Sequence, residues 1–251
     1  MKVLGIIPSR YASTRFPGKP LADICGKSMV QRVYEQAEAT AEVERVVVAT
    51  DDKRIVRNVE SFGGNVMLTG SSHANGTSRC LEVVEKLEKQ GHYFDVVMNI
   101  QGDEPLIQPD QISQLIALFS NETTDIATLA HRIREVEELM NPNAVKVVTG
   151  TQQQALYFSR QAIPFVRGEN PENRLGKIDF YKHLGIYAYR TSVLKKIVLL
   201  PPGKLEQAEK LEQLRWLENG FVIKVGITDY EGVGVDTPED LAKLINKICN
   251  E

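Results

Sequence analysis

The sequence predicts an α/β fold built on a doubly wound, mostly parallel sheet. Apolar runs that read as strands alternate with helix-like stretches through the first half of the chain. The runs are continuous rather than alternating with polar residues, which is typical of parallel strands covered by helices on both faces. The resulting βαβαβ order is that of a doubly wound sheet. The 251 residues, 42% of them hydrophobic, suffice for one large α/β domain or two small ones.

The elements follow from local patterns. Gly220 is a plausible stop for a helix, and Thr237, Pro238 and the acids after them form a good helix start. The polar stretch 167–177 has the composition of a loop. We expect one domain over 1–251, with a more mixed sub-region at about 150–220. Strands are expected at 3–7, 45–49, 66–69, 94–100, 155–158, 184–189 and 221–227, and helices at 29–39, 53–62, 78–87, 205–218 and from 237 onward.

Composition excludes several classes of protein. A net charge of −3 argues against general nucleic-acid binding, which favours a basic domain. No stretch approaches the roughly 18 apolar residues of a membrane span, and the short opening apolar run meets Pro8, unlike a signal peptide. Cys25, Cys80 and Cys249 are scattered, which favours a reducing compartment over a disulfide framework. We therefore expect a cytoplasmic protein.

A cationic segment, residues 9–19, directly follows the first apolar run. It holds Arg10, Arg15 and Lys19, and no carboxylate appears before Asp23. Ligands of α/β proteins bind at the carboxyl ends of the strands, so this segment is suited to a polyanion, most simply a nucleoside triphosphate. It lacks the glycines of a P-loop, so side chains must provide most of the binding. The alternative is a solvated basic loop.

Two aspartates also follow extended runs. Asp103 comes just after the expected strand 94–100, and Asp236 precedes the last helix. Mg²⁺ takes one or two carboxylates and lets substrate phosphates complete its shell. Asp103 also fits an ordinary turn, and Asp236 a helix cap, although Thr237 can fill that position. Together with the cationic segment, the two acids predict a site for Mg²⁺ and a triphosphate.

Other polar residues stand on or beside apolar elements. The turn 74–79 precedes a helix, so its N–H groups and hydroxyls could hold a base or a phosphate, but they also fit an ordinary helix start. Arg160 could bind a carboxylate, and His183, Tyr187 and Gln213 could bind hydroxyls. Taken singly, Tyr187 is more often a core aromatic, Glu212 more often lies on a solvated helix face, and His183 is more often structural than catalytic.

With these features, the chain resembles a known family, 3-deoxy-manno-octulosonate (Kdo) cytidylyltransferase, also called CMP-Kdo synthetase. The resemblance covers nearly the whole length and implies a sheet of the nucleotide-diphospho-sugar transferase type. It implies transfer from CTP to Kdo for lipopolysaccharide biosynthesis, a Mg²⁺ requirement and a homodimer. The motifs that carry it are IPSRYASTRFPGKPL (7–21), ATDD (49–52), NIQGDEPL (99–106), NPN (141–143), ALYFSR (155–160), YKHLGIY (181–187), LEQLR (211–215) and GVDTPEDL (234–241).

The resemblance also implies roles for individual residues. The sub-region at about 150–220 would provide contacts to the sugar acid and the dimer. The family turn usually reads Ser-Gly-Thr-Glu/Asp-Arg, whereas this chain has Asn75 and Ser78, so an acid is missing. The implied roles are catalytic contacts to the phosphates by Arg10, Arg15 and Lys19; metal binding by Asp103 and Asp236; nucleotide binding by Pro8, Ser9, Arg10, Ala74, Asn75, Gly76, Ser78, Arg79 and Gln101; and sugar-acid binding by Gln101, Arg160, His183, Tyr187, Glu212 and Gln213.

Three other functions are alternatives to this one. A cytidylyltransferase for another sugar acid, such as sialic acid or 8-amino-Kdo, would share most of these features. A glycosyltransferase typically carries a DxD acid pair, and that spacing is absent from the expected strand ends, where Asp51 and Asp52 are adjacent. A non-catalytic sugar-nucleotide-binding protein would bind CTP and release no pyrophosphate.

Overall fold

The computed structural model describes residues 1–12 and 15–249, so Ser13 and Thr14 of the cationic segment lie outside the described residues. The chain forms two compact units. The first comprises Met1–Ser113 and Gly232–Glu251, and the second comprises Gln114–Glu231. The expectation of a single domain over 1–251 stays a prediction.

The first unit contains four parallel strands. The central strand β1 pairs with β4 and β6, and β4 also pairs with β5. Leu4, Ile6 and Ile7 of β1 are fully buried, as the continuous apolar run predicts. The expectation of a mostly parallel α/β sheet is thus confirmed. The strands are β1 (Val3–Ser9), β4 (Arg45–Thr50), β5 (Val66–Leu68) and β6 (Val96–Asn99), and a separate hairpin is formed by β2 (Asp23–Ile24) and β3 (Lys27–Ser28).

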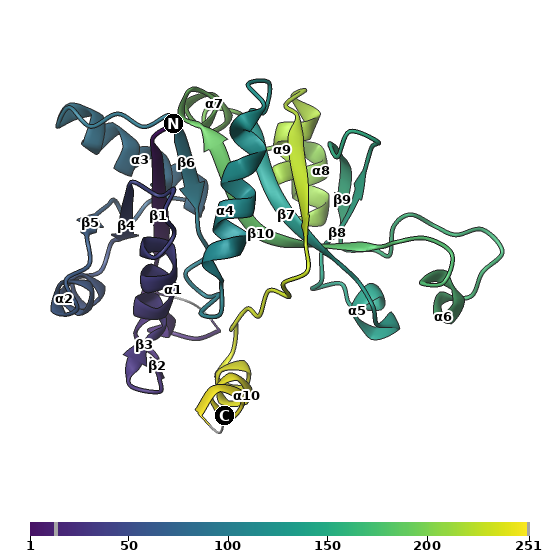
Figure 1. The fold of residues 1–251 in the computed structure, drawn as a ribbon, viewed down its shortest axis with the longest axis horizontal. Helices are drawn as coiled ribbons and strands as arrows, with labels where there is room; N and C mark the ends of the chain where they lie inside the picture. Colours follow the sequence, from purple (N-terminus) through teal and green to yellow (C-terminus); the bar gives the residue numbers. More distant parts are fainter. Residues whose placement is uncertain (13–14, 250–251) are drawn as a thin grey trace. The chain divides into compact units, whose positions relative to one another are not determined.

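Helices cover this sheet (Figure 1), where α1 contacts β1 and β4, and α3 contacts β1 and β6. The Ser28 hydroxyl caps α1 by accepting from the Gln31 N–H, and the Asn75 side chain caps α3 in the same way. The helices are η1 (Lys19–Leu21), α1 (Met29–Glu38), α2 (Lys53–Ser61), α3 (Gly76–Lys89), α4 (Pro109–Ala117), which continues into the second unit, and α10 (Pro238–Cys249).

The C-terminal segment belongs to the first unit because its apolar side chains pack there. Val235 and Leu244 form a buried cluster with Ile24 and Met29. At the start of α10, Asp240 accepts hydrogen bonds from the N–H groups of Asp236 and Thr237, and its own N–H donates to the Thr237 hydroxyl. The hydroxyl cap predicted for this helix is therefore present, and it fixes the backbone at Asp236.

The second unit has a mixed sheet. Strand β7 pairs with β11 in parallel and with β10 in antiparallel fashion, and β8 joins β10 to β9 in antiparallel pairs. Its strands are β7 (Ile126–Arg132), β8 (Lys146–Thr149), β9 (Ala155–Ser159), β10 (Tyr181–Arg190) and β11 (Ile223–Thr228), and its helices are η2 (Leu118–Ser120), α5 (Val136–Met140), α6 (Pro171–Arg174), α7 (Thr191–Ile197), α8 (Lys204–Glu209) and α9 (Gln213–Glu218).

Some expectations for this unit were wrong. The single helix expected over 205–218 is broken into α8 and α9, because Lys210 adopts a left-handed conformation with φ of 55° that ends α8. The loop expected over 167–177 contains the short helix α6. Strands β7 and β8 were not expected, since neither shows a clear period in the sequence.

Two further observations concern the length of the helices and the state of two cysteines. Among the described residues, none of the helices has the length and apolar character needed to cross a bilayer. Cys80 is free and buried, but Cys25 is disulfide-bonded. The expectation of a reducing compartment, drawn from the spacing of the cysteines, stays a prediction.

Candidate active site

A cluster of two cations and two acids lies in the first unit, at the end of the sheet where β1 and β6 finish. The Lys19 ammonium is 2.7 Å from a carboxylate oxygen of Asp103 and 3.4 Å from one of Asp236. The Arg15 guanidinium lies 3.0 Å from the other oxygen of Asp236. Although Lys19 and Asp236 are 217 positions apart in sequence, the structure brings all four side chains together, as the sequence analysis expected for Lys19, Asp103 and Asp236.

Backbone hydrogen bonds hold this cluster in place. The Val235 N–H donates to the Asp103 carbonyl at 2.9 Å, which ties the loop after β6 to the C-terminal segment. The Lys19 ammonium donates to the Val235 carbonyl, also at 2.9 Å. Because Val235 is fully buried, the neighbouring Asp236 is held at the surface beside Asp103.

The two carboxylates suit a hard divalent cation. Their side chains are part-exposed, 33% for Asp103 and 49% for Asp236, so both are accessible, and the Lys19 ammonium already stands between them as a positive charge. Mg²⁺ typically takes one or two carboxylates from a protein and fills its octahedral shell with phosphates and water. Among the residues described, no three His, Cys, Asp or Glu side chains group as a metal site.

A second cluster lies at the turn before α3. The Arg10 guanidinium donates to the His73 carbonyl, and the His73 ring contacts the Ser78 hydroxyl at 3.2 Å and the carboxylate of Glu82. Burial raises the pKa of Glu82, but hydrogen bonds from His73, Lys86 and the Gly70 N–H outweigh it and lower that pKa to about 2. The family turn usually has an acid where this chain has Ser78. Here an acid, Glu82, stands one helical turn further along α3.

Two glycines allow this turn and the loop after β6 to approach β1 closely. A Cβ atom on Gly102 would lie 3.1 Å from the Pro8 carbonyl and from the Ser9 hydroxyl, and one on Gly76 would lie 3.1 Å from the Asn99 side chain. Side chains larger than hydrogen would push these segments apart. Of the nucleotide-binding candidates, the structure therefore brings Pro8, Ser9 and Gly76 together, with Gln101 next to Gly102 in the chain.

Arg79, another nucleotide-binding candidate, lies in the core. Its side chain is 0% exposed, and its guanidinium donates to the Thr69 hydroxyl at 2.5 Å and lies 3.4 Å from Asp51. These contacts link α3 to the ends of β4 and β5. The geometry favours a role in positioning the turn before α3, so nucleotide contact by Arg79 stays an untested prediction.

In the second unit, Arg160 is held by backbone carbonyls. Its guanidinium donates to the carbonyls of Glu209 and Pro142, at 2.8 and 3.1 Å. The carbonyl of Arg160 accepts from the ammonium of Lys146, which is fully buried and also donates to two carbonyls of its own loop. Burial lowers the pKa of Lys146 to about 8. Lys146 was not predicted from the sequence, because no pattern marks a buried lysine.

His183 and Tyr187 belong to a buried aromatic cluster with Phe158, Tyr189 and Trp216. Burial lowers the pKa of His183 to about 3, and its Nε2 accepts from the Gly185 N–H. Burial also raises the pKa of Tyr187 well above its ordinary value. Within the described part of the chain, the Tyr187 hydroxyl and Trp216 Nε1 are buried without a hydrogen-bond partner. Gln213 is buried at the start of α9, the helix that also holds Trp216, and Glu212 directly precedes it.

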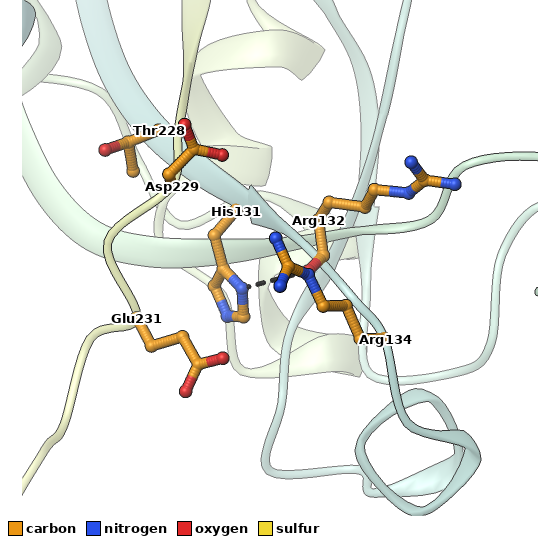
Figure 2. Close-up of a pocket in the computed structure, with 6 residues that line it drawn as sticks. All are labelled: His131, Arg132, Arg134, Thr228, Asp229 and Glu231. Carbon is orange, nitrogen blue, oxygen red and sulfur yellow. Dashed lines mark hydrogen bonds between the residues drawn. The ribbon is translucent and has the colours of Figure 1, made fainter.

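A small hollow of about 40 Å³ at the carboxyl ends of β7 and β11 was not predicted from the sequence. Figure 2 shows the lining residues, with the Arg134 guanidinium near the imidazole of His131 and the Arg132 side chain pointing away from it. His131 is buried, which lowers its pKa, and its Nδ1 lies 3.2 Å from the Arg132 carbonyl. Polar residues at the ends of two parallel strands were the signal that could have found it. The lining residues are His131, Arg132, Arg134, Thr228, Asp229 and Glu231.

Comparison with known proteins gives consistent results. A family model described as cytidylyltransferase matches residues 4–227. Proteins named 3-deoxy-manno-octulosonate cytidylyltransferase are 52% identical in Parabacteroides distasonis, covering 100% of this chain and 99% of that protein, and 54% identical in Bacteroides thetaiotaomicron, covering 96% of each.

Solved structures extend this similarity to the fold. A structure of CMP:2-keto-3-deoxy-manno-octonic acid synthetase complexed with CTP is 43% identical, covers 100% of this chain and 99% of its own, and has a TM-score of 0.92. A cytidylyltransferase from Leptospira borgpetersenii shares the fold at 17% identity, with coverage of 100% and 88% and a TM-score of 0.62. The chain belongs to the 3-deoxy-manno-octulosonate cytidylyltransferase family.

Proposed function

We propose that the chain transfers a cytidylyl group from CTP to Kdo. The anomeric hydroxyl oxygen of Kdo attacks the α-phosphorus of CTP, the bond between the α-phosphorus and its bridging oxygen breaks, and pyrophosphate leaves. The hydroxyl proton is released, and CMP-Kdo forms. The observation that carries this proposal is the cluster of Lys19, Arg15, Asp103 and Asp236 at one end of the parallel sheet, in a chain of this family.

The main obstacle to the reaction is electrostatic. An anionic sugar must approach a triphosphate, and two like unit charges at ~4 Å repel by ~4 kcal/mol at an effective dielectric of ~20. Arg10, Arg15 and Lys19 would contact the phosphates and stabilise charge on the leaving pyrophosphate. Phosphoryl-type transfer depends mostly on such positioning and charge stabilisation.

Asp103 and Asp236 would hold Mg²⁺. The ion would act as a Lewis acid on the phosphates and favour ionisation of the sugar hydroxyl. The part-exposed carboxylates and the cation between them support this assignment.

Nucleotide binding is proposed for Pro8, Ser9 and Gly76, with Gln101 beside them. The close approach of the Gly76 turn and the Gly102 loop to β1 supports it. Asn75 and Ser78 would hold this turn through the cap of α3.

Sugar-acid binding is proposed for the second unit. An unpaired buried hydroxyl is costly, and a polyhydroxy acid would supply an acceptor for Tyr187. Arg160, His183, Glu212 and Gln213 complete the proposed set, with Arg160 fixed by its carbonyl contacts.

We also propose a homodimer, in the cytoplasm, acting in lipopolysaccharide biosynthesis. Large apolar side chains exposed on the second unit support the dimer, among them Phe165, which is 72% exposed, and Leu156, which is 58% exposed. Nucleoside triphosphates are made inside the cell, which supports the location.

The test is pyrophosphate release with CTP, Mg²⁺ and a panel of sugar acids, with the product identified by mass. Kdo should give CMP-Kdo with a kcat/KM at least tenfold above that for sialic acid or 8-amino-Kdo. A higher kcat/KM for either of these would contradict the assignment of Kdo. Binding of CTP without pyrophosphate release from any sugar acid would contradict the proposed reaction.

A further inference from the structure

All the hydrogen-bonding capacity of the Lys19 ammonium is in use. An ammonium has three N–H donors, and Lys19 has three acceptors: Asp103 Oδ2 at 2.7 Å, the Val235 carbonyl at 2.9 Å and Asp236 Oδ1 at 3.4 Å. The side chain is only 14% exposed. Lys19 cannot bind a phosphate oxygen in this arrangement without releasing one of these acceptors.

Two of these acceptors, the carboxylates of Asp103 and Asp236, are also the groups to which a divalent cation is assigned. An ammonium and a divalent cation are both positive, and they compete for the same carboxylate oxygens of Asp103 and Asp236. Contact of the Lys19 ammonium with the two carboxylates therefore weakens the binding of a divalent cation there, and a bound divalent cation weakens the contact with Lys19.

We propose that Lys19 is a tethered counterion of the metal site. Its ammonium holds Asp103 and Asp236 together, is displaced from them when a divalent cation binds, and so becomes available to the triphosphate. This inference rests on the proposed function for the assignment of the cation to the two aspartates. It adds that one side chain couples metal binding to nucleotide binding, and the coupling must be reciprocal.

Direct competition must be separated from a general effect of positive charge. Arg10 provides the matched control, because it is a cation of the same segment whose contact is with the His73 carbonyl rather than with either aspartate. Lys19→Met and Arg10→Met each remove one positive charge. A general electrostatic effect would change metal affinity similarly in both, whereas displacement predicts a large change only for Lys19.

The first experiment titrates Mn²⁺ alone into the full chain and counts free Mn²⁺ by electron paramagnetic resonance. Lys19→Met should bind Mn²⁺ about tenfold more tightly than wild type, and Arg10→Met within about twofold of wild type. Lys19→Gln keeps a donor for the Val235 carbonyl and should also tighten binding. The proposal would be overturned if wild type and both Lys19 variants bound Mn²⁺ with equal affinity. It would also be overturned if Arg10→Met tightened Mn²⁺ binding as much as Lys19→Met does.

A second measurement uses the wild-type chain and does not depend on a variant folding. The lysines carry ¹³C and ¹⁵N labels, which leave all three N–H donors of each ammonium in place, and the Lys19 side-chain resonance is assigned through the backbone by triple-resonance NMR. Addition of Mg²⁺ should shift it as the ammonium leaves the two carboxylates. A Lys19 resonance that stays unchanged while Mg²⁺ binds would contradict displacement.

A third measurement addresses coupling. Without a sugar acid there is no transfer, so CTP affinity is measured with and without Mn²⁺. Mn²⁺ should raise CTP affinity by a larger factor in wild type than in Lys19→Met, and equal factors would contradict the coupling.

The outcome is distinguishable from that of the proposed function. If Kdo gives no CMP-Kdo while Lys19→Met tightens Mn²⁺ binding, the reaction assignment fails and the counterion role stands. If CMP-Kdo forms while Lys19→Met leaves the Mn²⁺ affinity unchanged, the counterion role fails and the reaction assignment stands.

Discussion

Arg79 shows how a residue in a functional motif can act through the core. Its guanidinium is fully buried between Thr69 and Asp51, so it joins three segments that lead into the candidate nucleotide site. A buried ion pair adds little net stability, but removing one partner leaves the other uncompensated. The residue therefore fixes the start of α3 rather than presenting its charge to solvent.

Arg79→Met should accordingly lower the free energy of unfolding by about 2–4 kcal/mol, measured by urea denaturation. Arg57→Met, at an exposed site on α2, is the control and should change it by no more than about 0.5 kcal/mol. Unchanged stability with a large rise in the KM for CTP would indicate direct nucleotide contact instead.

His183 makes the stability of the protein depend on pH. Its pKa is about 3 in the folded chain and about 6.5 when unfolded, so the unfolded state binds the extra proton first as pH falls. The contribution is fully present above pH ~6.5 and is lost progressively as pH falls toward 3.

Wild type should lose more stability than His183→Gln between pH 7 and pH 4, by a few kcal/mol at about 1.4 kcal/mol per pKa unit. Denaturation at several pH values measures this difference, and NMR of the His183 ring should show no titration above pH ~5. A ring that titrates near 6.5 in the folded protein would contradict the burial argument.

At the scale of elements, the cap of α3 connects stability with the candidate site. The Asn75 side chain accepts from the Ser78 N–H at 2.9 Å, so the residue that departs from the family turn still caps the helix. Asn75→Ala should cost about 1 kcal/mol in a denaturation experiment, whereas Asn75→Ser should cost only a few tenths because a hydroxyl can also cap. Equal losses in the two variants would exclude capping as the cause.

The elements of the first unit were largely predictable from the sequence. Its strands are continuous apolar runs and its helix starts carry capping residues, so local patterns and tertiary structure agree. The break at Lys210 was not predictable, because a lysine is a good helix former and its left-handed conformation gives no sequence signal. Strand β7 ends in His131 and Arg132. These polar residues line a hollow only because β7 pairs in parallel with β11, and that pairing cannot be seen in the local sequence.

At the scale of the molecule, the candidate site could be predicted only in part. Lys19 and Asp103 follow buried parallel strands, and this topology brings them together. Asp236 reaches them because Val235 and Leu244 pack against Ile24 and Met29, which is a tertiary contact that no local pattern encodes. The bonding of Arg160 to carbonyls likewise depends on the path of loops distant in sequence.

The proposed dimer belongs to this scale. Sedimentation equilibrium at micromolar concentration should give twice the chain mass, and Phe165→Ser should shift the equilibrium toward monomer because it removes exposed apolar surface. Leu68→Ser, an exposed apolar site on the first unit, is the control and should leave the mass unchanged. Wild type that sediments as a monomer would contradict the dimer.

The central claim is that Asp103 and Asp236, with Lys19, form the metal and triphosphate site of a cytidylyltransferase. Pyrophosphate release from CTP and Kdo should require Mg²⁺ and should fall by at least about a hundredfold in both Asp103→Asn and Asp236→Asn, with thermal unfolding confirming that each variant is folded. Turnover like that of wild type in both folded variants would contradict the claim.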